Sequence, residues 1–166
     1  ITKGLCKAKL SSSSREKMLI SREAIEEVIR SDQVVYGVNT GFGSLSSVVI
    51  EKDELESLQT NLIRSHACGI GERMDYESVL LMMVIRANSL AKGISGARPE
   101  LVDLILSMVN YRIAPIVPRI GSLGASGDLA PLSHMSLGLI GEGECARFLD
   151  DVWSVVDSQT ALSEAG

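Results

Sequence analysis

The chain has 166 residues, enough for one domain with a buried core, and its net charge of −5 with scattered Lys and Arg argues against a nucleic-acid-binding surface. Hydrophobic residues make up 45% of the chain but aromatic residues only 4%, so we expect a partner subunit or further sequence to cover part of an aliphatic surface. Because no apolar run reaches the ~18 residues of a membrane-spanning helix and the three cysteines are widely spaced, we predict a cytoplasmic protein with free thiols and no bound metal.

Four consecutive serines at residues 11–14, flanked by Lys and Arg, predict a flexible lead-in over residues 1–20. Ser21 is a favourable N-cap, and the residues after it carry an apolar face at helical spacing. The first helix is therefore predicted from Ser21 to about residues 31–32.

A short extended run is predicted at residues 34–38, followed by a turn-rich loop at residues 39–44. Tyr36 in this run is explained most simply as a half-buried strand tyrosine. The nearby glycines Gly41 and Gly43 would let a ligand approach the backbone, and in that setting Tyr36 becomes a candidate acid or base.

A second helix is predicted from Glu51, with an apolar stripe at Leu55, Leu58 and Leu62 that His66 continues four residues further on. The histidine is therefore expected on the buried face of the helix. Taken alone, it is best explained as a core histidine that bonds to a backbone carbonyl.

Asp75 predicts the N-cap of a third helix that ends near Lys92. Its middle, residues 79–85, is apolar on every side, which is typical of a helix in the centre of a bundle. In that position Arg86 and Asn88 would need hydrogen-bonding partners.

Pro99 suits the first turn of a fourth helix, and the short loops between helices imply antiparallel neighbours. Residues 115–118 should be extended because a residue before proline avoids the α region. A further helix is predicted from about Asp128, as N-cap, to Ile140. The predicted fold is mainly α, an antiparallel helical bundle with glycine-rich loops and a few short strands.

Residues 121–129, Gly-Ser-Leu-Gly-Ala-Ser-Gly-Asp-Leu, form the most distinctive stretch of the chain. A phosphate-binding loop would need a lysine, and a dinucleotide-binding loop would need a preceding strand and a different glycine spacing. Ser126 lacks the spacing of a nucleophile elbow. Ser126, Asp128 and His134 lie too close along one chain to be expected to converge as a triad.

Two explanations of this loop stay open. It is either a tight structural turn that caps a helix, or a segment in which the Gly127 nitrogen closes on the Ala125 carbonyl carbon, since small residues permit such strained backbone geometry. Loss of water from that ring and from Ser126 would leave a conjugated electrophile, which no unmodified side chain supplies.

The segments Gly-Ala-Ser-Gly-Asp-Leu-Ala-Pro-Leu-Ser-His at residues 124–134 and Tyr-Gly-Val-Asn-Thr-Gly-Phe-Gly at residues 36–43 resemble the aromatic amino acid ammonia-lyase family. Asn-Leu-Ile-Arg-Ser-His at residues 61–66 resembles its histidine-selective branch, because tyrosine- and phenylalanine-selective relatives typically differ at Ser65 and His66. The similarity spans about residues 30–145.

The resemblance implies that Ala125, Ser126 and Gly127 cyclise autocatalytically to a methylidene-imidazolone group, the electrophile of the reaction, with no metal or diffusible cofactor. It also implies roles for residues outside that tripeptide. These are Tyr36 as the base that removes the β-proton, His66 as the contact to the substrate imidazole, Gly43 and Leu129 as pocket residues, and Asp128 and Asn39 as supporting residues.

The implied activity is elimination of ammonia from L-histidine to give urocanate, in a homotetramer whose sites combine several subunits. Residues 1–166 would be the N-terminal portion of a longer chain, inactive in isolation, with residues 21–145 as the catalytic-loop and helix region and residues 146–166 as the start of a following segment. The alternatives are a tyrosine or phenylalanine ammonia-lyase or aminomutase with the same group, and a catalytically incomplete fragment that acts only in assembly.

Overall fold

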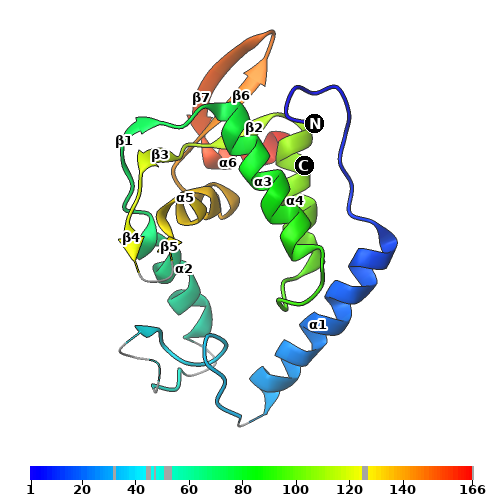
Figure 1. The fold of residues 1–166 in the computed structure, drawn as a ribbon, viewed down its shortest axis with the longest axis vertical. Helices are drawn as coiled ribbons and strands as arrows, with labels where there is room; N and C mark the ends of the chain where they lie inside the picture. Colours follow the sequence, from blue (N-terminus) through cyan, green and yellow to red (C-terminus); the bar gives the residue numbers. More distant parts are fainter. Residues whose placement is uncertain (32, 44–45, 47, 51–53, 125–126, 166) are drawn as a thin grey trace.

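The computed structural model describes residues 1–31, 33–43, 46, 48–50, 54–124 and 127–165 (Figure 1). Within these ranges helices dominate, so the predicted mainly α fold is confirmed. The helices are α1 (Ser12–Arg30), α2 (Leu55–His66), α3 (Tyr76–Leu90), α4 (Pro99–Asn110), α5 (Ala130–Leu139) and α6 (Ser158–Ala165). The strands are β1 (Ile70–Arg73), β2 (Ile113–Pro115), β3 (Pro118–Ile120), β4 (Leu123–Gly124), β5 (Gly127–Asp128), β6 (Glu144–Leu149) and β7 (Val152–Asp157).

Helix α1 begins at Ser12 and not at Ser21, so the prediction of a flexible lead-in is wrong from Ser12 onward. The hydroxyl oxygen of Ser11 accepts the backbone N–H of Ser14 at 3.2 Å and caps the helix. Serine hydroxyls compete for backbone groups, which predicts a loop, but the same property makes serine a good N-cap. The predicted end is confirmed, with Ser31 as C-cap.

The hydrophobic core lies between α3, α4 and β2 and is closed by α5, β6 and α6. Side chains with at most 1% exposure come from each of α3, α4 and β2. They include Val79, Leu80, Met83, Val102, Ile105, Met108 and Ile113. The last part of the chain belongs to the same core, because Cys145 and Ala161 are fully buried members of it.

The prediction that α3 is buried all round is wrong for this chain. One face of the helix is in the core, but Leu81 and Ile85 are 52% and 61% exposed on the opposite side. Arg86 and Asn88 are also exposed, so they do not need the buried partners that the sequence suggested. The N-cap is as predicted, since the Asp75 carboxylate accepts the N–H of Ser78 at 2.9 Å.

The hairpin of β6 and β7 was not predicted, although its turn has a sequence signal. Leu149 pairs with Val152, and the two residues between them, Asp150 and Asp151, have φ values of 51° and 62°. Two central residues with positive φ match a type I′ turn, in which aspartate is tolerated. The hairpin packs on the core through the guanidinium of Arg112, which lies 3.6 Å from the ring centre of Phe148.

Helix α5 directly follows the glycine-rich segment and approaches β2 closely. Leu129 and not Asp128 is the N-cap residue, while Asp128 contributes through Oδ1, which accepts the Ala130 N–H at 3.2 Å. Pro131 lies in the first turn, where proline is tolerated. At Gly138 an added Cβ would lie 2.7 Å from Cγ of Pro115, so only a glycine permits this distance between helix and strand.

Substitution of Gly138 by alanine should destabilise the protein by about 1–3 kcal/mol because the new methyl group overlaps Pro115 and Cys145. This cost should exceed the gain of about 1 kcal/mol in helix propensity. Thermal or denaturant unfolding measures the difference. Ser136→Ala on the same helix is the control and should change stability by less than about 0.5 kcal/mol. A Gly138→Ala variant that is as stable as the parent would contradict the packing argument.

Candidate functional site

A cavity of about 530 Å³ opens between the loop after α1, one face of α2 and one face of α5. It brings together Tyr36, Gly43, His66 and Leu129, which are far apart in the sequence and were all predicted as site residues. Of the other predicted residues, Ala125 and Ser126 lie outside the described residues. The cavity therefore unites the loop and helix motifs that the sequence singled out separately.

Six further residues line this cavity and were missed by the site prediction: Phe42, Leu62, Ile63, Leu132, Ser133 and Ser136. Those on α5 follow Leu129 at positions i+3, i+4 and i+7, which is the spacing of one helix face. That periodicity was present in the sequence. It could not be used because nothing in the sequence showed which face of α5 meets α2.

His66 lies at the last turn of α2 and is half-buried. Its Nδ1 lies 2.9 Å from the carbonyl oxygen of Leu62 and 3.1 Å from the hydroxyl of Ser65. A carbonyl oxygen can only accept, so a short Nδ1 contact assigns the proton to Nδ1. The predicted bond to a backbone carbonyl is therefore present. In a neutral ring with the proton on Nδ1, the lone pair of Nε2 is the acceptor.

Tyr36 lies in a turn and not in the predicted extended run. The N–H groups of Val38 and Asn39 both bond to the carbonyl of Val35, at 3.1 and 3.3 Å. The side chain of Asn39 holds this turn, since its Oδ1 accepts the Val35 N–H at 2.8 Å. Tyr36 is 63% exposed, which excludes the half-buried strand tyrosine, and its ring contacts Phe42 edge-on.

The described residues before and after Ala125 and Ser126 form a short antiparallel pair. Gly124 lies opposite Gly127 in the pairing of β4 with β5. Gly127 has a φ of 102°, a conformation that side chains other than glycine rarely adopt. Asp128 closes the base of the loop, because its Oδ1 accepts the Ser122 N–H at 2.9 Å.

His134, on α5, does not line the cavity, but it bonds to the segment that follows His66. Its Nε2 accepts the backbone N–H of Gly69 at 3.0 Å. Partial burial lowers the pKa of His134 below its ordinary value of about 6.5, which favours the neutral ring that this acceptor role requires. The imagined triad with Asp128 is not formed, because the Asp128 carboxylate is engaged by backbone N–H groups of its own loop.

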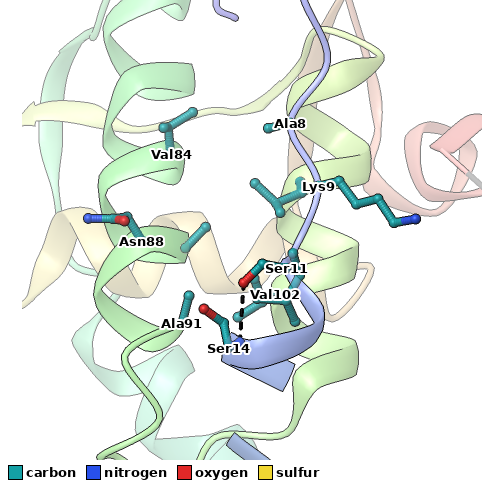
Figure 2. Close-up of a pocket in the computed structure, with 11 residues that line it drawn as sticks. Ala8, Lys9, Ser11, Ser14, Val84, Asn88, Ala91 and Val102 are labelled. Carbon is teal, nitrogen blue, oxygen red and sulfur yellow. Dashed lines mark hydrogen bonds between the residues drawn. The ribbon is translucent and has the colours of Figure 1, made fainter. Parts of the chain in front are cut away.

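A second cavity, of about 280 Å³, lies between the segment before α1 and helices α3 and α4 (Figure 2). In Figure 2 the amide of Asn88 and the ammonium group of Lys9 point away from the enclosed space. The hydroxyl of Ser11 caps α1 and is engaged by Ser14. This cavity therefore resembles a packing gap, and it is separate from the residues of the first cavity.

No group of three or more potential metal ligands is found within the described ranges, and none of the helices there combines the length and apolar character that a bilayer-spanning segment requires.

Comparison with known proteins places this geometry in context. A sequence model of the family described as aromatic amino acid lyase matches residues 1–166. A histidine ammonia-lyase of Bacillus cereus is 53% identical over 131 residues, which is 79% of this chain and 26% of that protein. The chain thus spans about a quarter of the length of the curated relatives it matches.

Two solved structures share the fold closely. The crystal structure of histidine ammonia-lyase from Trypanosoma cruzi superimposes with a TM-score of 0.85 at 37% identity, over 96% of this chain and 30% of that one. Tyrosine aminomutase from Streptomyces globisporus superimposes with a TM-score of 0.80 at 37% identity, over 93% of this chain and 28% of that one.

The lowered pKa of His134 predicts a pH dependence of stability. Since the unfolded chain takes up the proton first, the free energy of unfolding should be highest above pH ~6.5 and should fall as the pH drops through 6.5 toward the folded-state pKa. The stability difference between about pH 7.5 and about pH 5.5 should therefore be smaller in His134→Gln than in the parent.

Glu142→Gln is the control for this measurement. In the parent protein, the hydrogen bond from Arg64 lowers the pKa of Glu142 below a value that is already acidic. The Glu142 carboxylate therefore stays ionised between about pH 7.5 and about pH 5.5. The variant should keep the parent's pH dependence. If His134→Gln also keeps it, the assigned protonation state of His134 is wrong.

Proposed function

Because the chain belongs to the aromatic amino acid lyase family, we propose that the protein that contains it eliminates ammonia from L-histidine and releases urocanate. The observation that carries the proposal is the single cavity that gathers Tyr36, Gly43, His66 and Leu129. Leu129 directly follows the glycine-rich loop, so this cavity adjoins the segment from which the electrophile would form. The 53% identity to a histidine ammonia-lyase supports histidine as the substrate.

His66 is the proposed contact to the substrate ring. The bond from Nδ1 to the Leu62 carbonyl leaves Nε2 as an acceptor, and an imidazole ring carries an N–H that can donate to it. The surrounding wall is largely apolar, with Leu62, Ile63 and Leu132. A neutral imidazole suits such a wall, because it needs only a few hydrogen bonds in return for leaving water.

The residues present fit a methylidene-imidazolone group formed from Ala125, Ser126 and Gly127. Cyclisation requires the Gly127 nitrogen to approach the Ala125 carbonyl carbon, and the pairing of Gly124 with Gly127 holds the ends of that segment together. An added Cβ at Gly127 would meet nothing within 4 Å, so the obstacle to a side chain there is the positive φ and not a neighbouring atom. When formed, the group supplies the electrophile that activates the substrate for loss of its amino group.

Tyr36 is the proposed base. As a phenolate it takes the proton from the β-carbon of the substrate, and the electrons of that C–H bond form the C=C bond of the product. The C–N bond breaks with its electron pair on nitrogen, so that the protonated amino group leaves as ammonia. Asn39 holds the turn that carries Tyr36, and Asp128 holds the base of the glycine-rich loop. Both residues thus support the site through the backbone, as their predicted supporting role requires.

The proposed enzyme is a cytoplasmic homotetramer in which residues 1–166 are the N-terminal portion of each chain. The relatives are about three times as long as this chain, since 131 matched residues are 26% of the Bacillus cereus protein, and the apolar face of α3 with Leu81 and Ile85 is exposed here. We propose that the rest of the chain or neighbouring subunits cover this face and complete the catalytic site. The isolated segment would then be inactive.

A tyrosine-directed enzyme is the second candidate, because tyrosine aminomutase from Streptomyces globisporus is as similar in sequence, at 37%, as the histidine ammonia-lyase of Trypanosoma cruzi. His66 favours histidine over tyrosine. Product analysis separates the candidates, since an aminomutase returns a β-amino acid and a lyase returns an unsaturated acid with free ammonia.

The decisive experiment is intact-mass analysis of the full-length protein together with urocanate formation from L-histidine. Cyclisation removes two water molecules, so the mass should be about 36 Da below that of the translated sequence. Ser126→Ala is the control and should lose both the two-water mass difference and the activity. An unmodified mass in the parent protein would refute the proposed chemistry.

Replacement of Tyr36 by phenylalanine should lower kcat by about 10²–10⁴-fold with little change in KM, because the lost proton transfer matters only in the transition state. Steady-state kinetics with L-histidine provide the measurement. Tyr111→Phe is the matched control, since Tyr111 is exposed and does not line the cavity. If Tyr36→Phe turns over at the parent rate, another group is the base.

A further inference from the structure

The chain contains two histidines, and the structure links their positions. His66 lines the cavity at the end of α2, while His134 lies on α5 outside the cavity and bonds to Gly69, three residues after His66. We propose that His134 is a positioning residue: by accepting the Gly69 N–H it holds the C-terminal end of α2 against α5 and so sets the place of His66. This inference rests on the proposed function.

Gly69 leaves little room for a side chain. An added Cβ would lie 3.0 Å from Nε2 of His134 and 3.2 Å from Cβ of Pro118. The space beside the Gly69 backbone is therefore filled by the His134 ring and by the proline that begins β3. This contact restricts the direction in which the chain leaves α2.

The segment of α5 that carries His134 is also fixed with respect to the cavity. Ser133, the residue before His134, and Ser136 both line the cavity on α5. β3, which begins at Pro118, leads into the glycine-rich loop and pairs with β1 directly after Gly69. The hydrogen bond thus joins α5 to the segment after α2, and the packing of Gly69 against Pro118 connects both to β3.

The other polar link between α2 and the end of α5 is a weaker candidate for this role. Arg64 and Glu142 form an ion pair, with Nε 3.0 Å from Oε2, and their side chains are 53% and 34% exposed. Water competes for the charges of an ion pair that is open to solvent, which weakens it as a restraint. The bond of His134 is partly buried and acts directly on the backbone that follows His66, so it is the stronger candidate for the restraint on His66.

The test uses the full-length protein with its prosthetic group and compares three substitutions. His134→Leu removes the acceptor and should raise KM for L-histidine about tenfold with kcat nearly unchanged, because a displaced His66 weakens substrate and transition state alike. His134→Gln offers an amide oxygen to the Gly69 N–H and should stay near the parent KM. Glu142→Gln breaks the exposed pair and should leave KM unchanged.

A double-mutant cycle separates positioning from a general structural role. If His134 acts through His66, then adding His134→Leu to a His66→Leu enzyme should raise KM no further. Independent, multiplicative effects on KM would overturn the proposal, and so would an unchanged KM in His134→Leu. If His134→Leu does not fold, Gly69→Ala in an otherwise unaltered protein should give the same rise in KM, and an unchanged KM there would also overturn it.

Different results would refute the proposed function and the positioning role of His134. A parent protein with an unmodified mass and no urocanate production would refute the proposed function as a whole. A parent protein that is active on L-histidine, combined with a His134→Leu variant of unchanged KM, would refute the positioning role of His134 alone.

Discussion

The packing of α5 against α2 is the contact on which the candidate site depends. Each helix contributes one face to the cavity, and neither face could bind a small molecule without the other. The distance between α5 and the core is set by Gly138, whose missing side chain lets the helix lie directly against Pro115. A change in the core beneath α5 would therefore shift Leu129 and Ser133 relative to His66.

Hydrogen bonds to backbone groups orient most of the site. Asn39 holds the turn of Tyr36, the Leu62 carbonyl selects the ring nitrogen of His66 that carries the proton, and Asp128 holds the base of the glycine-rich loop. A side chain that hydrogen-bonds to a backbone group keeps its orientation when a neighbouring side chain is replaced, because the backbone group is still present. A family that acts on different amino acids can in this way vary the residues that face the substrate and keep the surrounding support.

Local sequence signals predicted some elements well. Asp75 as an N-cap, Pro99 in a first turn and the extended backbone around Pro118 depend on neighbouring residues only, and the structure has all three. The start of α1 was wrong because serine favours both loops and caps, and only packing decides between them. The prediction that α3 is buried all round was wrong for a related reason. Hydrophobicity shows that a surface tends to be buried, but it does not show which segment covers that surface.

The sequence by itself determined the motifs of the site: the small residues around Gly127, the tyrosine and glycines of residues 36–43, and the histidine at the end of α2. Their chemistry follows from residue type and short spacing. Only the tertiary structure decided that Tyr36, His66 and Leu129 share one cavity, and that His134 bonds to Gly69 and does not join Asp128 in a triad. Such contacts join residues far apart along the chain, and they depend on how α2, α5 and β3 pack, which no local pattern specifies.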